Sequence, residues 1–190
     1  LVAGAIIMPG DADMESAAGW TAGASGGDAT TGVWTRGEPI GTEAQPEVDA
    51  SEDGDLCWFT GQGSVGGGLG ENDVDGGRTT LLTPVIDMAG LADPTISYLR
   101  WYSNVAGGAA GADIFEIDIS NNGGSSWVSV EVVGPTGAGT EGGWTVNSFR
   151  VLDLVSPTSQ VQMRFVASDL GGGSIVEAAI DEFLVTDVNR

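Results

Sequence analysis

The sequence predicts an all-β protein, folded as an antiparallel sandwich of two sheets with about ten or eleven strands. Three observations support this prediction. Glycine supplies 32 of the 190 residues, the apolar runs are short, and no segment repeats with the 3.6-residue period of an amphipathic helix. The predicted strands also follow one another at short intervals, roughly 8–15 residues, as is typical of two-sheet sandwiches.

In the first half of the chain, short strands alternate with long polar loops. The expected strands lie at residues 1–8, 33–35, 56–60 and 79–84. Residues 37–55 separate two of them and hold two prolines and seven carboxylates. Because this composition is too polar for a core, we expect one long surface loop, of a length that is usually functional or metal-bound.

The second half contains longer and more apolar strands. They are expected at residues 96–102, 113–120, 126–133, 144–152, 161–168 and 173–185. Asn121-Asn122-Gly123-Gly124 joins the second of these to the third, and Asn-Gly is the strongest short hairpin signal. This hairpin is the best-defined local element of the sequence.

The last of these strands is apolar on both faces, which predicts that it is covered on both sides. Strand side chains alternate faces with period two, so Glu177 and Asp181 are expected to share a face with Phe183 and Val185. A buried carboxylate needs a cation, an arginine or several hydrogen-bond donors, because a bare charge costs several kcal/mol. The alternative is that both carboxylates reach water near the strand ends.

Charge and composition exclude several function classes. The chain has 27 acidic residues, six arginines, no lysine and a net charge of −21, which excludes a nucleic-acid binder and disfavours anionic membranes. Histidine is absent and Cys57 is the single cysteine, so the usual general base, zinc ligand, nucleophile pair and intrachain disulfide are missing. No carboxylate pair stands out as catalytic, and we expect no enzyme activity.

The abundant acids have three interpretations, which are calcium ligation, adaptation to salt, and solubility. Glu71-x-Asp73-x-Asp75-Gly76 has the spacing of a calcium loop, as does the segment from residue 49 to residue 55. Neither is an EF-hand, because their twelfth positions are Leu82 and Thr60.

Trp34 and Trp127 are the best candidates for exposed platforms on which a sugar ring could stack, because each lies near a loop or tight turn. The alternative is that the tryptophans fill the core. Arg100 and Arg164 each interrupt a strong strand. They indicate structural ion pairs, for which Glu177 is the candidate partner.

The ends of the chain indicate a piece of something longer. The opening apolar run is too short to span a membrane and lacks the basic start of a signal peptide. We expect residues 1–10 to be a strand or the end of a linker, and residues 11–187 to form one domain.

Several segments resemble MAM-like modules appended to secreted bacterial peptidases and other exported enzymes. They are Asp28-Ala29-Thr30-Thr31-Gly32-Val33-Trp34, Asn72-Asp73-Val74-Asp75-Gly76-Gly77, Arg100-Trp101-Tyr102-Ser103-Asn104 and Ser174-Ile175-Val176-Glu177-Ala178-Ala179-Ile180-Asp181. The ends of the same region, Glu15 with Gly19-Trp20 and Ala179 to Phe183, are similar to those that bracket the β-jelly rolls of carbohydrate-binding modules. The lone Cys57 departs from animal MAM domains, which carry disulfides.

The resemblance implies a jelly roll with a structural calcium ion where the first and last strands meet. Glu15 and Asp181 match its two carboxylate ligands, Asp73 or Asp75 looks like the loop carboxylate that joins them, and a carbonyl near Asp13 completes the set.

The expected function is that of a calcium-stabilised, non-catalytic accessory module of an exported bacterial protein, secreted or at the cell surface. It would bind carbohydrate or an extracellular protein, or stabilise its parent. The alternative is a self-associating structural subunit of a surface layer or fibre, pairing through the N-terminal strand.

Overall fold

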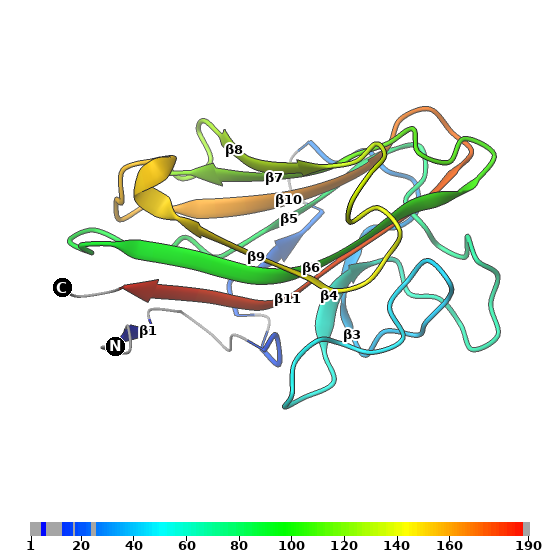
Figure 1. Ribbon diagram of the computed structural model, residues 1–190, viewed down its shortest axis with the longest axis horizontal. Helices are drawn as coiled ribbons and strands as arrows, with labels where there is room; N and C mark the ends of the chain where they lie inside the picture. Colours follow the sequence, from blue (N-terminus) through cyan, green and yellow to red (C-terminus); the bar gives the residue numbers. More distant parts are fainter. Residues whose placement is uncertain (1–4, 7–12, 17, 24–25, 188–190) are drawn as a thin grey trace.

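The computed structural model describes residues 5–6, 13–16, 18–23 and 26–187. It consists of two antiparallel sheets that lie face to face (Figure 1). The six-stranded sheet is formed by β3 (Trp34–Gly37), β4 (Cys57–Thr60), β11 (Ser174–Asp187), β6 (Pro94–Gly107) and β9 (Thr145–Arg150) in this order, with β1 (Ala5–Ile6) paired to β11. The five-stranded sheet has the order β2 (Thr21–Ala22), β5 (Gly77–Leu82), β10 (Gln162–Asp169), β7 (Phe115–Ser120) and β8 (Val128–Val133).

This architecture confirms the predicted all-β, two-sheet jelly-roll sandwich. The only helix in the described part of the chain is a 3-10 turn, η1 (Val151–Asp153), and no described helix is long and apolar enough to cross a membrane. The predicted hairpin is present as β7 and β8, with Gly123 and Gly124 at positive φ in the turn. Of the predicted N-terminal strand, Ala5–Ile6 pair with Thr186 and Asp187, and the rest of residues 1–10 lies outside the described residues.

β11 is covered on both faces, as its sequence predicts. Val176, Ala178 and Ile180 face the core between the sheets, whereas Ala179 packs with Cys57 and Phe59 on the outer face. That outer face lies under the connection from β3 to β4, residues 38–56, which we call the covering loop. Two indole N–H groups hold the loop in place: Trp101 donates to the Ala44 carbonyl at 2.7 Å and Trp144 to the Val48 carbonyl at 3.2 Å.

A β-bulge in β11 changes which residues share a face. The pairing with β6 shifts register between Asp181 and Leu184, and Glu182 adopts a left-handed φ of 50°. A bulge reverses the alternation beyond it. Phe183 and Val185 therefore enter the core, and the prediction that Asp181 shares their face is wrong.

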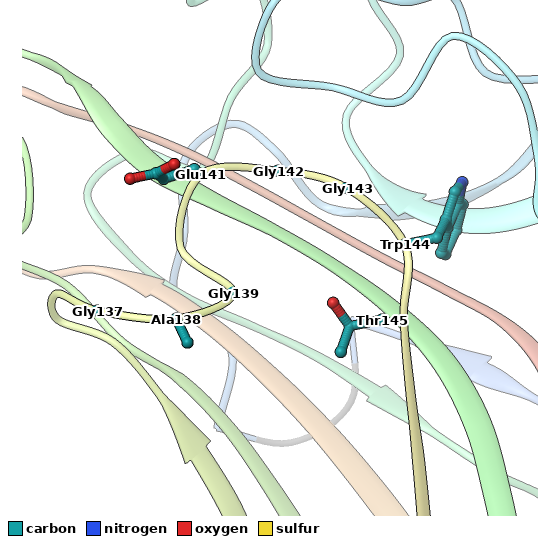
Figure 2. A pocket seen from close by; sticks show the side chains of 8 residues that line it. All are labelled: Gly137, Ala138, Gly139, Glu141, Gly142, Gly143, Trp144 and Thr145. Atoms are coloured by element: carbon teal, nitrogen blue, oxygen red, sulfur yellow. The ribbon is translucent and has the colours of Figure 1, made fainter.

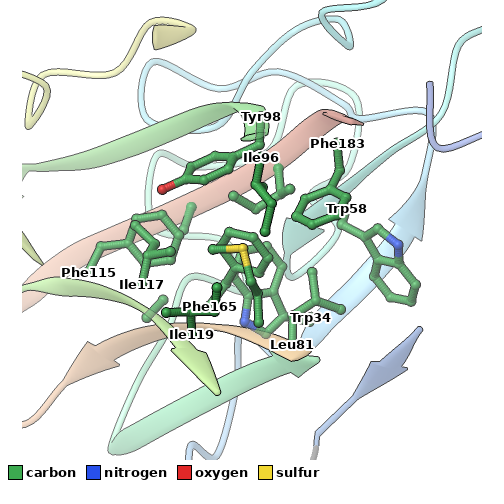
Figure 3. Close-up of a cluster of buried hydrophobic side chains, with 14 of the residues drawn as sticks. Trp34, Trp58, Leu81, Ile96, Tyr98, Phe115, Ile117, Ile119, Phe165 and Phe183 are labelled. Carbon is green, nitrogen blue, oxygen red and sulfur yellow. The ribbon is translucent and has the colours of Figure 1, made fainter. Parts of the chain in front are cut away.

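The core between the sheets is rich in aromatic side chains. Phe165 of β10 stacks on Trp20 with ring centroids 6.3 Å apart and meets Tyr98 and Phe183 edge-on at 5.4 and 6.4 Å. Figure 3 shows Phe165 between the side chains that come from the two sheets. Aromatic contacts of this kind stabilise beyond the area that they bury.

Because Phe165 is fully buried, Phe165→Ala should lower the free energy of unfolding by about 3–5 kcal/mol. Val132→Ala is the control, because Val132 is 52% exposed and should change stability by no more than about 0.5 kcal/mol. Urea denaturation of both variants measures the difference. Equal losses in the two variants would contradict this packing.

Candidate functional site

The outer face of the five-stranded sheet carries a hollow of about 250 Å³. Leu81 and Phe165 point into the core, so their strand neighbours in β5 and β10 point outward. The residues that line the hollow come from these two strands and the β7–β8 turn: Thr80, Leu82, Gly123, Gly124, Trp127, Gln162 and Arg164.

Arg164 is held in a defined position in this hollow. Its Nε donates to Asp118 Oδ2 at 2.7 Å, and its guanidinium carbon lies 4.7 Å from the centroid of the Trp127 ring. The Arg164 side chain is 36% exposed, so donors remain available to a ligand. Gln162 is anchored by its amide nitrogen, which donates to the Thr83 carbonyl at 2.9 Å. An apolar ring beside fixed polar groups can bind the C–H face and the hydroxyls of a sugar.

The two predicted stacking platforms lie in different environments. Trp127 is half-buried at the edge of the hollow. Trp34 is only 3% exposed, its indole N–H donates to the Thr79 carbonyl at 3.2 Å, and its ring packs on Phe115. The prediction that Trp34 is an exposed platform is therefore wrong. Nearness to a loop in sequence does not report which face of a strand a residue occupies.

Glu177 is not the partner of either arginine, in contrast to the sequence prediction. Arg164 pairs with its cross-strand neighbour Asp118, and Arg100 Nε donates to Glu131 Oε1 at 3.0 Å. The physical reason is geometric. Arg100 continues the inward-facing series of Ile96, Tyr98 and Tyr102, whereas Glu177 lies on the opposite face of the sheet.

A larger hollow, about 470 Å³, lies at the loop between β8 and β9 (Figure 2). Its walls are mostly glycine backbone, with the side chains of Glu141, Trp144 and Thr145. The indole N–H of Trp144 is used by the covering loop, and its ring meets Trp101 edge-on at 6.0 Å. Because few free recognition groups face this hollow, its size does not make it the better binding site.

Asp181 fixes the covering loop to β11. Its Oδ2 accepts hydrogen bonds from the amides of Ala50 at 2.7 Å and Ser51 at 3.1 Å, and its Oδ1 accepts one from Glu182 at 2.8 Å. Burial raises the pKa of Asp181 to about 7, and the charge of Asp49 acts in the same direction against these amide bonds.

Glu15, Asp13 and Asp49 lie on the segments around Asp181. Glu15 Oε1 accepts the amides of Asp55 at 3.0 Å and Leu56 at 2.8 Å, so it holds the end of the covering loop. Burial raises the pKa of Glu182, and the charges of Asp13, Glu52 and Asp49 add to this effect. Among the described residues, however, no three aspartate, glutamate or cysteine side chains stand close enough to hold a metal ion together.

Asp73 and Asp75 do not join Glu15 and Asp181, which corrects the predicted ligand set. Asp73 Oδ2 accepts a hydrogen bond from the amide of Val176 at 3.3 Å. Val176 precedes Asp181 by five residues on β11, which corresponds to about 16 Å along the strand. Asp75 pairs with Thr31 instead. Burial and the charge of Asp75 raise the pKa of Asp73 to about 6. Asp49, from the other predicted calcium loop, is the loop carboxylate near Asp181.

Glu177 is 1% exposed, and its Oε2 receives a hydrogen bond from Thr60 Oγ1 at 2.7 Å. Its Oε1 has no partner among the described residues. Burial raises the pKa of Glu177 well above its ordinary value, against the lowering effect of the Thr60 bond. No arginine among the described residues pairs with this carboxyl group, so its burial favours the protonated form.

Comparison with known proteins supports the fold alone. No protein family profile matches the chain, and no curated protein resembles it significantly. The K1 adhesin domain of Lys-gingipain from Porphyromonas gingivalis W83 superposes with a TM-score of 0.54 at 15% identity, covering 94% of this chain and 96% of that one. A cyclase of Fischerella sp. TAU also gives a TM-score of 0.54, at 8% identity, covering 98% of this chain and 99% of that one.

A xylan-binding module of Paenibacillus barcinonensis covers 99% of this chain and 97% of its own, at 14% identity and a TM-score of 0.47. An adhesin domain and a cyclase thus share this sandwich at the same TM-score of 0.54. This sandwich therefore does not determine a function by itself, and the function has to be argued from the surface of the chain.

The buried acids predict an unusual dependence of stability on pH. Their folded-state pKa values lie above those of the unfolded chain, so the folded state binds more protons. In metal-free buffer, the free energy of unfolding should therefore fall as pH rises from about 4 to about 7, the folded pKa of Asp181, and beyond. Urea denaturation across this range measures the slope.

Glu177→Gln should make that slope shallower and raise stability at neutral pH, because the amide mimics the protonated acid. Glu116→Gln, on a half-buried residue of β7, is the matched control and should leave the slope unchanged. A wild-type protein that gains stability from pH 4 to 7 would contradict the assignment.

Proposed function

We propose that this chain is a non-catalytic carbohydrate-binding module whose binding face is the outer face of the five-stranded sheet. The observation that carries this proposal is the hollow in which Trp127 lies beside Arg164 and Gln162. The indole offers an apolar face, the guanidinium and amide offer planar donors, and Asp118 fixes the guanidinium. Shallow polar hollows with one aromatic wall suit hydroxyl-rich ligands, whereas deep apolar cavities suit hydrophobic ones.

The absence of enzymatic activity is part of the proposal. The chain has no histidine, and Asp118, the carboxylate bound to Arg164 beside the hollow, is engaged in that ion pair. An adhesin domain among the structural neighbours supports a binding role. The cyclase neighbour favours an enzymatic role instead, but its sequence is only 8% identical to this chain. We further propose that the module belongs to an exported protein and acts outside the cell or at its surface, as the MAM-like sequence features suggest.

The saccharide site is tested with the intact chain and soluble polysaccharides, including xylan and mixed-linkage β-glucan, by affinity electrophoresis and calorimetry. Trp127→Ala should weaken binding at least tenfold, or about 1.4 kcal/mol. Trp127→Phe should keep part of it because an aromatic ring remains. Trp34→Phe, in the core, should leave affinity unchanged while lowering stability. Failure of all saccharides to bind, or equal binding by Trp127→Ala, would contradict the proposal.

We also propose that a calcium ion stabilises the fold near Asp181, held with Asp49, Glu15 and backbone carbonyls around Asp13. The donor set fits calcium in chemistry, because it consists of oxygens and calcium accepts flexible cages of them. The described carboxylates do not by themselves form a three-ligand group, so backbone carbonyls would have to complete the cage. Asp181 accepts three amide bonds, which leaves part of its lone-pair capacity for a cation.

Removal of calcium should lower the melting temperature. Binding to the native state alone stabilises by about 2.7 kcal/mol at a hundredfold excess over Kd, which corresponds to very roughly 5–11 °C in a domain of this size. Calorimetry in EDTA, calcium and magnesium measures the effect, and magnesium should restore much less. Asp181→Asn should lose most of the response, whereas Asp73→Asn should keep it. An unchanged melting curve in EDTA, with no calcium by elemental analysis, would contradict the site.

A further inference from the structure

A third hollow, about 230 Å³, lies on the outer face of the six-stranded sheet, on the opposite side of the molecule from the Trp127 hollow. Its floor is apolar and consists of Leu99 of β6, Val146 of β9 and Leu184 of β11. Two acids, Glu52 of the covering loop and Glu182 of the β11 bulge, also line it. The hollow therefore combines an apolar floor with negative charge at one end.

β9, which supplies Val146 to this hollow, is an edge strand. β9 pairs with β6 over all six of its residues without a register shift, and it is the last strand of its sheet in the described part of the chain. Val146 on this edge is 68% exposed. Natural edge strands are usually protected by proline, bulges, inward charges or short length, and β9 has neither proline nor bulge.

A long basic side chain matches the hollow in both shape and charge. The aliphatic stem of lysine or arginine packs along apolar surface while the charged head stays at a polar margin. In this hollow, the stem would lie over Val146 and Leu99, and the head would reach Glu52 and Glu182. None of the ion pairs between described residues involves these two acids, and the net charge of −21 attracts a cationic partner.

We propose that β9 and this hollow form a docking site for an extended polypeptide segment that carries a lysine or arginine. The segment would add a strand to the free edge of β9, so that main-chain hydrogen bonds supply affinity. One basic side chain, entering over Val146, would supply specificity. A second copy of this chain is disfavoured as the occupant, because two surfaces of the same high negative charge repel each other.

The probe is a blocked seven-residue peptide that alternates threonine and valine and carries one central arginine. It is titrated into the intact, isotope-labelled chain while backbone amide shifts are followed by NMR. The shifts should concentrate on Val146 to Phe149 and on the rim of the hollow. Peptides with glutamate or norleucine in place of the arginine should bind more weakly, the glutamate peptide by at least tenfold, and added salt should weaken the arginine peptide.

Two variants test the acids directly. Glu52→Gln and Glu182→Gln should each weaken the arginine peptide by about three- to fivefold, the loss expected for a partly exposed ion pair, and should leave the norleucine peptide unchanged. Glu141→Gln, an exposed acid outside the hollow, is the matched control and should have no effect.

Shifts confined to β8 or to the Trp127 hollow would overturn the proposal, as would equal binding of the arginine and glutamate peptides. Absence of any shift at millimolar peptide would overturn it as well. The saccharide proposal is judged independently, because Trp127→Ala leaves this hollow intact.

Discussion

Burial of β11 on both faces is the constraint on which the rest of the structure depends. One face packs into the aromatic core and the other lies under the covering loop. Asp181 makes this possible, because its carboxylate accepts hydrogen bonds from the amides of Ala50 and Ser51. These bonds hold the polar covering loop against the outer face of the sheet. The bulge at Glu182 then turns Phe183 inward. Asp181 can thus face the covering loop while Phe183, two positions later, packs in the core.

The distribution of charge follows from this arrangement. Arginine is scarce, and the ion pairs of the described residues use Arg100 on the inward-facing side of β6, Arg150 at the end of the edge strand β9 and Arg164 on the outer face of β10. The acids around β11 are left to backbone amides, protons and, as proposed, calcium. The raised pKa values of Asp73, Glu177 and Asp181 are therefore a consequence of burial that no cationic partner offsets among the described residues. The same shortage leaves Glu52 and Glu182 outside the ion pairs of the described residues, and both line the proposed docking site.

Most of the fold could be predicted because alternation and turn residues are local signals. The Asn122-Gly123 turn fixes the β7–β8 hairpin, and the two-sided apolar pattern of β11 predicts its cover. The bulge could not be predicted, because nothing in Asp181-Glu182-Phe183 announces a left-handed φ at a glutamate. The positions of Asp73 and Asp75 relative to β11 could not be predicted from the sequence either. The spacing of acidic residues indicates a turn, but it does not indicate which part of β11 lies beside that turn.

The positions of the two candidate tryptophans could be predicted only in part, for the same reason. Trp127 follows a tight hairpin, and this local signal correctly indicated a surface position, whereas Trp34 has no local feature that distinguishes a buried from an exposed strand face. The partner of Arg164 depends on the register between β10 and β7, which is a long-range property. One signal in the sequence could have indicated this partner. Asp118 alternates with the inward-facing Ile117 and Ile119, so it lies on the outer face, where a neighbouring strand can place an arginine opposite it.

The anchoring of the covering loop by Asp181 is tested most directly by amide hydrogen exchange. The amides of Ala50 and Ser51 should exchange slowly, at rates near those of the β11 amides, although they belong to a loop without regular secondary structure. In Asp181→Asn, these two amides should exchange much faster while the core amides of β10 change little. Rapid exchange of Ala50 and Ser51 in the wild-type chain would contradict the account.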